Sequence, residues 1–123
     1  MPTTTARAVV DADPGPFVLS PFVLAELACL VQRGLGVGAE CDLLDDVDAG
    51  VYTLVAFGDD DLSEATALVR RYSDLGIGLT DASVVVLASK YRTVNLLCTD
   101  ERHFRAVQPL RGGSAFRLLP ADI

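Results

Sequence analysis

Three acidic residues stand in separate short motifs where a divalent metal ion could be held. Asp100 follows an apolar run, residues 94–98, that has the composition of a buried strand. Asp81 follows a glycine-rich segment and lies in the first turn of a predicted helix, and Glu26 lies inside another predicted helix. Ligands of open α/β sheets bind where strands end, and carboxylate oxygens suit hard cations such as Mg²⁺ and Mn²⁺. An ion held there can activate water against a phosphodiester.

Each of these acids also has a purely structural interpretation. Asp100 could cap a helix that begins at Glu101, since Asp is a preferred N-cap residue. Asp81 could complement the positive end of its helix dipole. Glu26 could belong to a solvated helix face, an interpretation weakened by its apolar neighbours Val23, Ala25, Leu27 and Leu30. The residues alone leave both interpretations open for each acid.

The surroundings of Asp100 supply basic side chains but few further ligands. Arg102 and Arg105 could contact the phosphates of a nucleic acid, or they could lie on a solvated helix face. His103 is the only histidine, which excludes a zinc site built on several histidines. The segment 34–38 is rich in glycine but follows a predicted helix rather than a strand, which is the wrong context for a phosphate-binding loop.

Charge is distributed unevenly along the 123 residues. The net charge of −7 argues against a general nucleic-acid binder. Residues 1–89 carry 14 acidic and 4 basic side chains, whereas residues 90–123 carry 3 acidic and 6 basic ones. This asymmetry fits a phosphate-binding rim beside an acidic metal pocket, or simply a solvated surface.

The chain has the composition of a globular protein, with 50% hydrophobic residues. No apolar run reaches the ~18 residues that span a bilayer, and the first residues lack the apolar stretch of a signal peptide. The three cysteines, Cys29, Cys41 and Cys98, fit neither a disulfide framework nor a zinc site. Cys29 and Cys98 lie in apolar runs, so we expect buried thiols and a cytoplasmic location.

Strands and helices alternate in the predicted order. Expected strands cover residues 17–19, 51–55, 94–98 and 116–119. Expected helices cover residues 3–11, 21–33, 39–48, 60–73, 81–90 and 101–107. Ser20-Pro21 opens the second of these helices, Gly34, Gly36 and Gly38 end it, and Thr80 caps the fifth. We therefore expect one α/β domain, residues 1–123, with a mostly parallel sheet and helices on both faces.

Several motifs, taken in order, resemble a PIN domain, and more closely the VapC-type toxins of bacterial type II toxin–antitoxin systems. They are Ser20-Pro21 followed by Glu26, then the segment 78–83 with Asp81, then the segment 97–100 with Asp100 and His103-Phe104. The closing segment 107–113, with Phe116 and Leu119-Pro120, also looks like one branch of these toxins. The resemblance covers nearly the whole chain from Phe17 onward.

The resemblance implies a PIN-like three-layer fold and a metal-dependent ribonuclease. Glu26, Asp81 and Asp100 match the family's acids, which hold Mg²⁺ or Mn²⁺ and cut RNA. Arg102 and Arg105 would then contact RNA phosphates. The implied partners are RNA, a cognate antitoxin that blocks the site, and a second copy in a homodimer.

The chain departs from the family pattern in two places. The family opens with a strand that ends in an aspartate, and we expect this N-terminal strand to be missing here. Asp11 is a weak substitute because only 15 residues separate it from Glu26, too few for a crossover to a parallel neighbour. Cys98 stands where the family often has a threonine, so an orienting hydroxyl is lost unless Thr99 replaces it.

These departures leave two main hypotheses of function. One is a metal-dependent ribonuclease toxin whose activity is reduced by the missing first carboxylate. The other is a catalytically weak, truncated PIN-like module that binds an antitoxin or a twin subunit. A receiver-like module is disfavoured, because no suitable pair of strand and aspartate is present. A missing strand should also leave a gap or an exposed edge in the sheet, which would favour pairing or aggregation.

Overall fold

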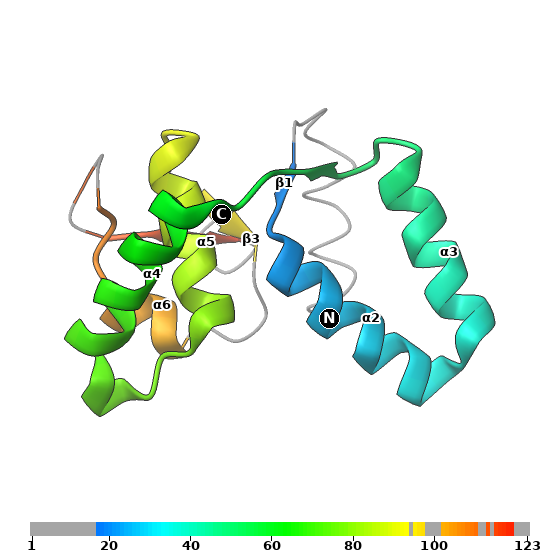
Figure 1. Ribbon diagram of the computed structural model, residues 1–123, viewed down its shortest axis with the longest axis horizontal. Helices are drawn as coiled ribbons and strands as arrows, with labels where there is room; N and C mark the ends of the chain where they lie inside the picture. The colour runs from blue at the N-terminus through cyan, green and yellow to red at the C-terminus, as the bar shows by residue number, and fades with distance from the viewer. Residues whose placement is uncertain (1–16, 94, 98–101, 111–112, 114, 120–123) are drawn as a thin grey trace. The chain divides into compact units, whose positions relative to one another are not determined.

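The described residues form two compact units along the chain (Figure 1). The computed structural model describes residues 17–93, 95–97, 102–110, 113 and 115–119. The first unit ends at Asp59 and the second begins at Asp60. The predicted short helix at residues 3–11, together with Asp11, lies outside the described residues.

The first unit contains two helices and a parallel pair of short strands. It runs through β1 (Val18–Leu19), α2 (Pro21–Leu35), α3 (Val37–Asp48) and β2 (Thr53–Leu54). Val18 pairs with Thr53 and Leu19 with Leu54. The Thr53 backbone N–H donates to the Phe17 carbonyl at 2.8 Å, and the Val55 N–H donates to that of Leu19 at 3.3 Å.

Helix α2 begins where the sequence predicts. The Ser20 hydroxyl accepts hydrogen bonds from the backbone N–H groups of Phe22 at 3.2 Å and Val23 at 3.5 Å. Pro21 occupies the first helical position, where no N–H is needed. Of the three glycines expected to end the helix, only Gly36 does so, with a φ of 93° that favours glycine. Gly34 lies inside α2 and Gly38 inside α3.

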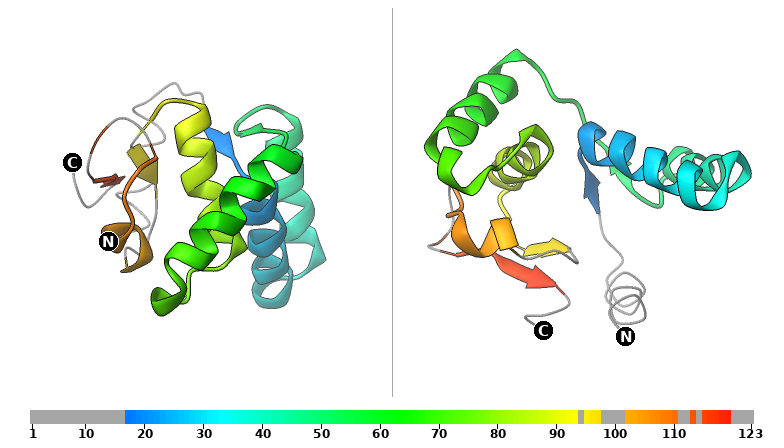
Figure 2. Two further views of the ribbon diagram at one scale, coloured as in Figure 1. Left: turned by 60° about the vertical axis from the view of Figure 1, so that its left-hand side comes forward. Right: turned by 90° about the horizontal axis from the view of Figure 1, so that it is seen from below.

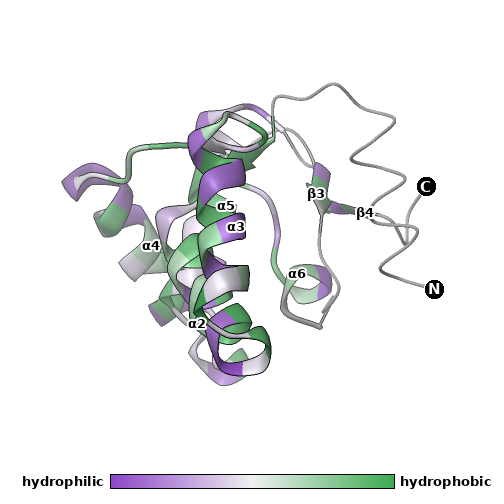
Figure 3. Ribbon diagram, turned by 90° about the vertical axis from the view of Figure 1, so that its right-hand side faces the viewer, coloured by the Kyte–Doolittle hydropathy of each residue, from purple (hydrophilic) through white to green (hydrophobic). Residues whose placement is uncertain are grey.

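The first unit buries few of its helical side chains. Ala28 is the buried residue of α2, and none of the residues of α3 is buried. Phe22 and Phe57 meet edge to face, with their ring centroids 5.0 Å apart. Both helices show green hydrophobic stretches between purple hydrophilic ones (Figure 3). On α3, Leu43 and Val47 are half-buried, while Leu44 is 41% exposed.

The second unit combines three α-helices, a short 3₁₀ helix and another parallel pair of strands. Its elements are α4 (Asp59–Arg71, beginning one residue before the unit), η1 (Ser73–Leu75), α5 (Leu79–Lys90), β3 (Asn95–Leu97), α6 (Arg102–Ala106) and β4 (Arg117–Leu119). The register pairs Asn95 with Arg117 and Leu96 with Leu118. Helices α4 and α5 lie side by side in both views of Figure 2.

Helix α5 is the centre of the second unit's core. Six of its residues are buried: Ala82, Ser83, Val85, Val86, Leu87 and Ala88. The other buried apolar side chains of this unit, among the described residues, are Ala65, Leu68, Ile77, Leu96, Phe104, Val107, Phe116 and Leu118. A helix that is apolar on most of its faces is expected to be enclosed by other elements. The predicted capping role of Thr80 is wrong, because Gly78 is the N-cap residue and Thr80 lies inside the helix.

The four predicted strands are all present, each within two residues of its expected ends. Both pairs are parallel, as predicted for the α/β class. Among the described strands, however, the pairs β1–β2 and β3–β4 form two separate two-stranded sheets rather than one. None of the helices in the described residues combines the length and apolarity needed to cross a membrane.

Candidate metal centre

Asp81 is presented by the best-anchored helix of the second unit. It lies half-buried in the first turn of α5, and the two residues that follow it, Ala82 and Ser83, are fully buried. The Ser83 hydroxyl donates a 2.6 Å hydrogen bond to the Thr80 carbonyl, which tightens this turn. A negative charge is favourable at this end of the helix dipole. Asp81 therefore offers a carboxylate at a fixed position.

The chain segment that leads to Asp81 contains a residue in the left-handed backbone conformation. Gly76 ends the 3₁₀ helix η1 with a φ of 67°, a conformation that costs glycine little and other residues more. Ile77, the next residue, is only 4% exposed and anchors the chain in the core. The glycine-rich segment thus reverses the chain and then starts α5.

Glu26 lies in the middle of α2 and is exposed. Its neighbours Ala25, Leu27 and Leu30 are exposed as well. The expectation that apolar neighbours enclose Glu26 is therefore wrong for these three, while Val23 is half-buried. Glu26 belongs to the first unit and Asp81 to the second.

Asp100 lies outside the described residues, as do Cys98, Thr99 and Glu101. Arg102 and His103 are placed as backbone at the start of α6. Arg105, in the same helix, is exposed. The convergence of Glu26, Asp81 and Asp100 on one ion, and the phosphate contacts of Arg102 and Arg105, remain predictions.

The described residues offer the type of donor atom that a hard cation binds. Glu26 and Asp81 contribute carboxylate oxygens, which Mg²⁺ and Mn²⁺ prefer. Within the described ranges, no group of three or more His, Cys, Asp or Glu side chains is close enough to hold a metal ion. Cys29 and Cys41 are exposed, so the predicted burial of Cys29 is wrong.

Two of the basic side chains expected to form a phosphate-binding rim lie far from Asp81. Lys90 and Arg92 stand at the opposite end of α5, and nine residues of helix separate Asp81 from Lys90 by about 14 Å. The Lys90 ammonium is paired with the Asp61 carboxylate at 3.3 Å. These two residues therefore do not belong to a rim around Asp81.

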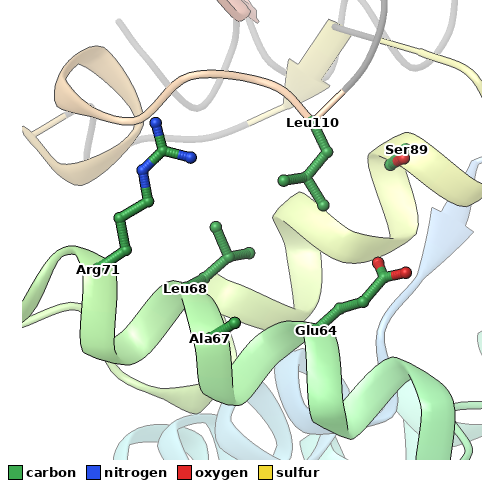
Figure 4. Close-up of a pocket in the computed structure, with 6 residues that line it drawn as sticks. All are labelled: Glu64, Ala67, Leu68, Arg71, Ser89 and Leu110. Carbon is green, nitrogen blue, oxygen red and sulfur yellow. The ribbon is translucent and has the colours of Figure 1, made fainter.

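The sequence analysis missed a hollow between α4, the end of α5 and the segment at Leu110 (Figure 4). Its volume is about 330 Å³, and its walls are Glu64, Ala67, Leu68, Arg71, Ser89 and Leu110. Glu64 and Arg71 are seven residues apart in the sequence, and this two-turn spacing was a signal that could have pointed to this surface.

The chain is similar in sequence to one curated protein over most of its length. It is 40% identical over 111 residues to Ribonuclease VapC26 of Mycobacterium tuberculosis (strain ATCC 25618 / H37Rv). The match covers 90% of this chain and 82% of that protein. No model of a known protein family matches the chain.

Proposed function

Because the chain belongs to the VapC-type family of PIN-domain toxins, we propose that it is a metal-dependent endoribonuclease, the toxin of a toxin–antitoxin pair. The observation that supports this most strongly is the 40% identity, across 90% of the chain, to a protein named as a ribonuclease. The proposed partners are an RNA substrate, a cognate antitoxin and a second copy of the chain. The proposed setting is the cytoplasm, and the proposed fold is a single PIN-like domain with helices on both faces of its sheet.

We assign Glu26, Asp81 and Asp100 as the residues that would hold Mg²⁺ or Mn²⁺. One such ion needs only one or two protein carboxylates, together with water and substrate phosphate oxygens. When bound, the ion would supply an activated water and stabilise charge on the cleaved phosphate. Asp81 contributes a carboxylate fixed by the buried start of α5. Arg102 and Arg105 would position the RNA through its phosphates.

RNA cleavage with and without added metal tests this proposal. We expect Mg²⁺- or Mn²⁺-dependent cleavage of a structured RNA. Asp81→Asn, Glu26→Gln and Asp100→Asn each keep the shape of the side chain and remove its charge. Each variant should lower the cleavage rate at least about a hundredfold. Losing a residue that only hydrogen-bonds to a metal ligand costs up to about a hundredfold, and losing the ligand itself should cost at least as much. Asp46→Asn, an exposed change in α3, serves as the control and should leave cleavage unchanged.

A second candidate function is a catalytically weak module that binds an antitoxin or a twin subunit. It is favoured by the exposure of Glu26 in α2. The two candidates differ in a direct measurement. A folded chain that binds its antitoxin yet leaves RNA intact at saturating Mg²⁺ and Mn²⁺ would support the binding module and rule out the ribonuclease.

A further inference from the structure

A recess between α4 and the end of α5 offers hydrogen-bond donors and acceptors around a small apolar floor. Its volume is about 290 Å³, and its walls are Asp61, Glu64, Val86, Ser89, Lys90 and Arg92. We call it the Lys90 recess. Its volume lies just below the range of about 300–1,000 Å³ that is typical of sites for drug-sized ligands. The Lys90 recess therefore suits one small planar group better than a larger ligand.

An ion pair joins the two helices that line the Lys90 recess. The Lys90 ammonium lies 3.3 Å from the Asp61 carboxylate, and this contact occupies one of its three donor hydrogens. Glu64 stands three residues after Asp61 and therefore on the same face of α4. Among the described residues, the ion pair of this unit leaves Glu64 out, and Glu64 is exposed. The recess thus presents an accepting carboxylate and a donating ammonium.

Arg92, at the rim of the recess, has a backbone conformation that glycine adopts with less strain. Its φ is 55°, the positive value found among the described residues other than glycine. The Arg92 N–H donates to the Ser89 carbonyl at 3.1 Å, and the Thr93 N–H donates to the Ala88 carbonyl at 2.9 Å. This is the usual end of a helix at a glycine. Strained residues gather at functional sites, and the side chain of Arg92 is exposed.

The donors and acceptors of the recess match the edge of one nucleobase. A carboxylate can accept from two adjacent N–H groups, and an ammonium can donate to an oxygen beside them. Guanine presents N1–H and N2–H side by side, with O6 next to them. Adenine, cytosine and uracil each present a single donor group on this edge. Proteins recognise bases of single-stranded RNA through this edge, so the recess is complementary to guanine.

We propose that the Lys90 recess binds a guanine base of single-stranded RNA. The Glu64 carboxylate accepts from guanine N1–H and N2–H, the Lys90 ammonium donates to O6, and the Arg92 guanidinium donates to a phosphate of the same strand. Val86, 1% exposed, forms the floor under the base. Lys90 is separated from Asp81 by about 14 Å of helix, so these contacts select the RNA sequence and take no part in cleavage.

This inference rests on the proposed ribonuclease function, which supplies the RNA. It is tested by binding in the absence of metal, so the two proposals fail separately. A chain that cleaves RNA without selecting guanine refutes this inference alone. A chain that selects guanine without cleaving RNA refutes the cleavage proposal alone.

Fluorescence anisotropy of labelled oligoribonucleotides with the full chain, in EDTA, measures this binding. The probes are oligouridylates of one length with a single central guanosine, inosine, 7-deazaguanosine or adenosine. Inosine lacks the N2 amine from which Glu64 accepts, whereas 7-deazaguanosine keeps the whole edge. The guanosine and 7-deazaguanosine probes should bind equally. The inosine and adenosine probes should bind about tenfold or more weakly, because each leaves the charged acceptor with a lost hydrogen bond.

Two variants separate the contact to the base from the contact to the phosphate. Glu64→Gln keeps the shape of the side chain but replaces one acceptor by a donor, so it should remove the preference for guanosine over inosine. Arg92→Gly relieves the strained backbone, so the chain should resist urea at least as well as the parent. The same variant should nevertheless weaken binding of all four probes. It should also reduce the slope of log K against log salt by about 0.7, the value for one phosphate contact on a single strand.

The controls make similar changes on the first unit. Asp46→Asn and Arg33→Gln lie at exposed positions of α3 and α2, and both should leave the affinities and the salt dependence unchanged.

Three results would overturn the proposal. Equal binding of the four probes means that the recess does not recognise guanine. A preference for guanosine that survives Glu64→Gln means that recognition occurs elsewhere on the chain. GMP, titrated by calorimetry, that binds as tightly as the guanosine probe means that the recess takes a free nucleotide rather than RNA.

Discussion

The Tyr72 hydroxyl accepts a 3.2 Å hydrogen bond from the backbone N–H of Gln108, 36 residues further along the chain. This contact ties the residue that follows α4 to the segment that follows α6. The same tyrosine ring supports the Arg71 guanidinium. One side chain therefore organises both the packing of the second unit and one end of the hollow.

Removing the Tyr72 hydroxyl should destabilise the fold modestly. Tyr72→Phe keeps the ring under Arg71 but leaves the Gln108 N–H without its acceptor, and we expect a loss of about 1 kcal/mol in the free energy of unfolding. Urea denaturation measures this. Tyr91→Phe, at a residue that is 45% exposed, is the control and should change stability by less than about 0.5 kcal/mol. Equal losses in the two variants would contradict the assigned role of the hydroxyl.

The contribution of the α2 N-cap to the free energy of unfolding should also be measurable by urea denaturation. Ser20→Ala removes the oxygen that accepts from the Phe22 and Val23 N–H groups, so unfolding should become easier by about 1 kcal/mol. Ser63→Ala, within α4 at an exposed position, offers a serine without a capping role and should stay within about 0.5 kcal/mol of the parent. No difference between the two variants would mean that the cap does not stabilise α2.

Truncation of Leu118 should destabilise the fold more than Tyr72→Phe or Ser20→Ala. Leu118 is 0% exposed in β4, and Leu118→Ala should cost about 2–5 kcal/mol, because it removes buried contacts and leaves a cavity. Leu35→Ala changes the same side chain at a site that is 77% exposed and should have little effect. Thermal unfolding followed by circular dichroism compares the two. A mild effect at Leu118 would show that the second unit is packed less tightly than its burial indicates.

Metal binding should stabilise the folded chain through the proposed carboxylates. A free Mn²⁺ concentration of 100 times the dissociation constant would add about 2.7 kcal/mol to the free energy of unfolding, and chelation with EDTA should reverse the gain. Asp81→Asn should abolish most of this stabilisation, while Asp46→Asn should retain it. An equal stabilisation of the Asp81→Asn variant would exclude Asp81 as a ligand.

Local signals in the sequence predicted the elements well. Ser20-Pro21 fixes the start of α2 because both residues act within one turn. Gly34 and Gly36 look alike in sequence, yet only Gly36 adopts a positive φ, since a glycine inside a helix is tolerated where neighbouring turns persist. The choice of Thr80 over Gly78 as a cap failed because these two residues, two positions apart, both suit an N-cap, and only one residue can occupy that position.

Tertiary relationships were harder to predict. Cys29 and Leu30 lie in an apolar run but are exposed, because periodicity shows which face is apolar and not what covers it. The four strands were expected in one sheet, and the described strands form two pairs. Motif order placed Glu26 and Asp81 on the correct kinds of element, but their separation depends on how the elements pack, which local patterns do not encode.

The burial of α5 has a consequence for the timescale on which Asp81 moves. Amide protons of a helix enclosed along six residues exchange with solvent only when the surrounding core opens, so they should be among the slowest of the second unit. The helical positions of α2, with Ala28 as its buried residue, should exchange sooner. The backbone of Asp81 thus belongs to a segment that stays closed between rare openings of the core.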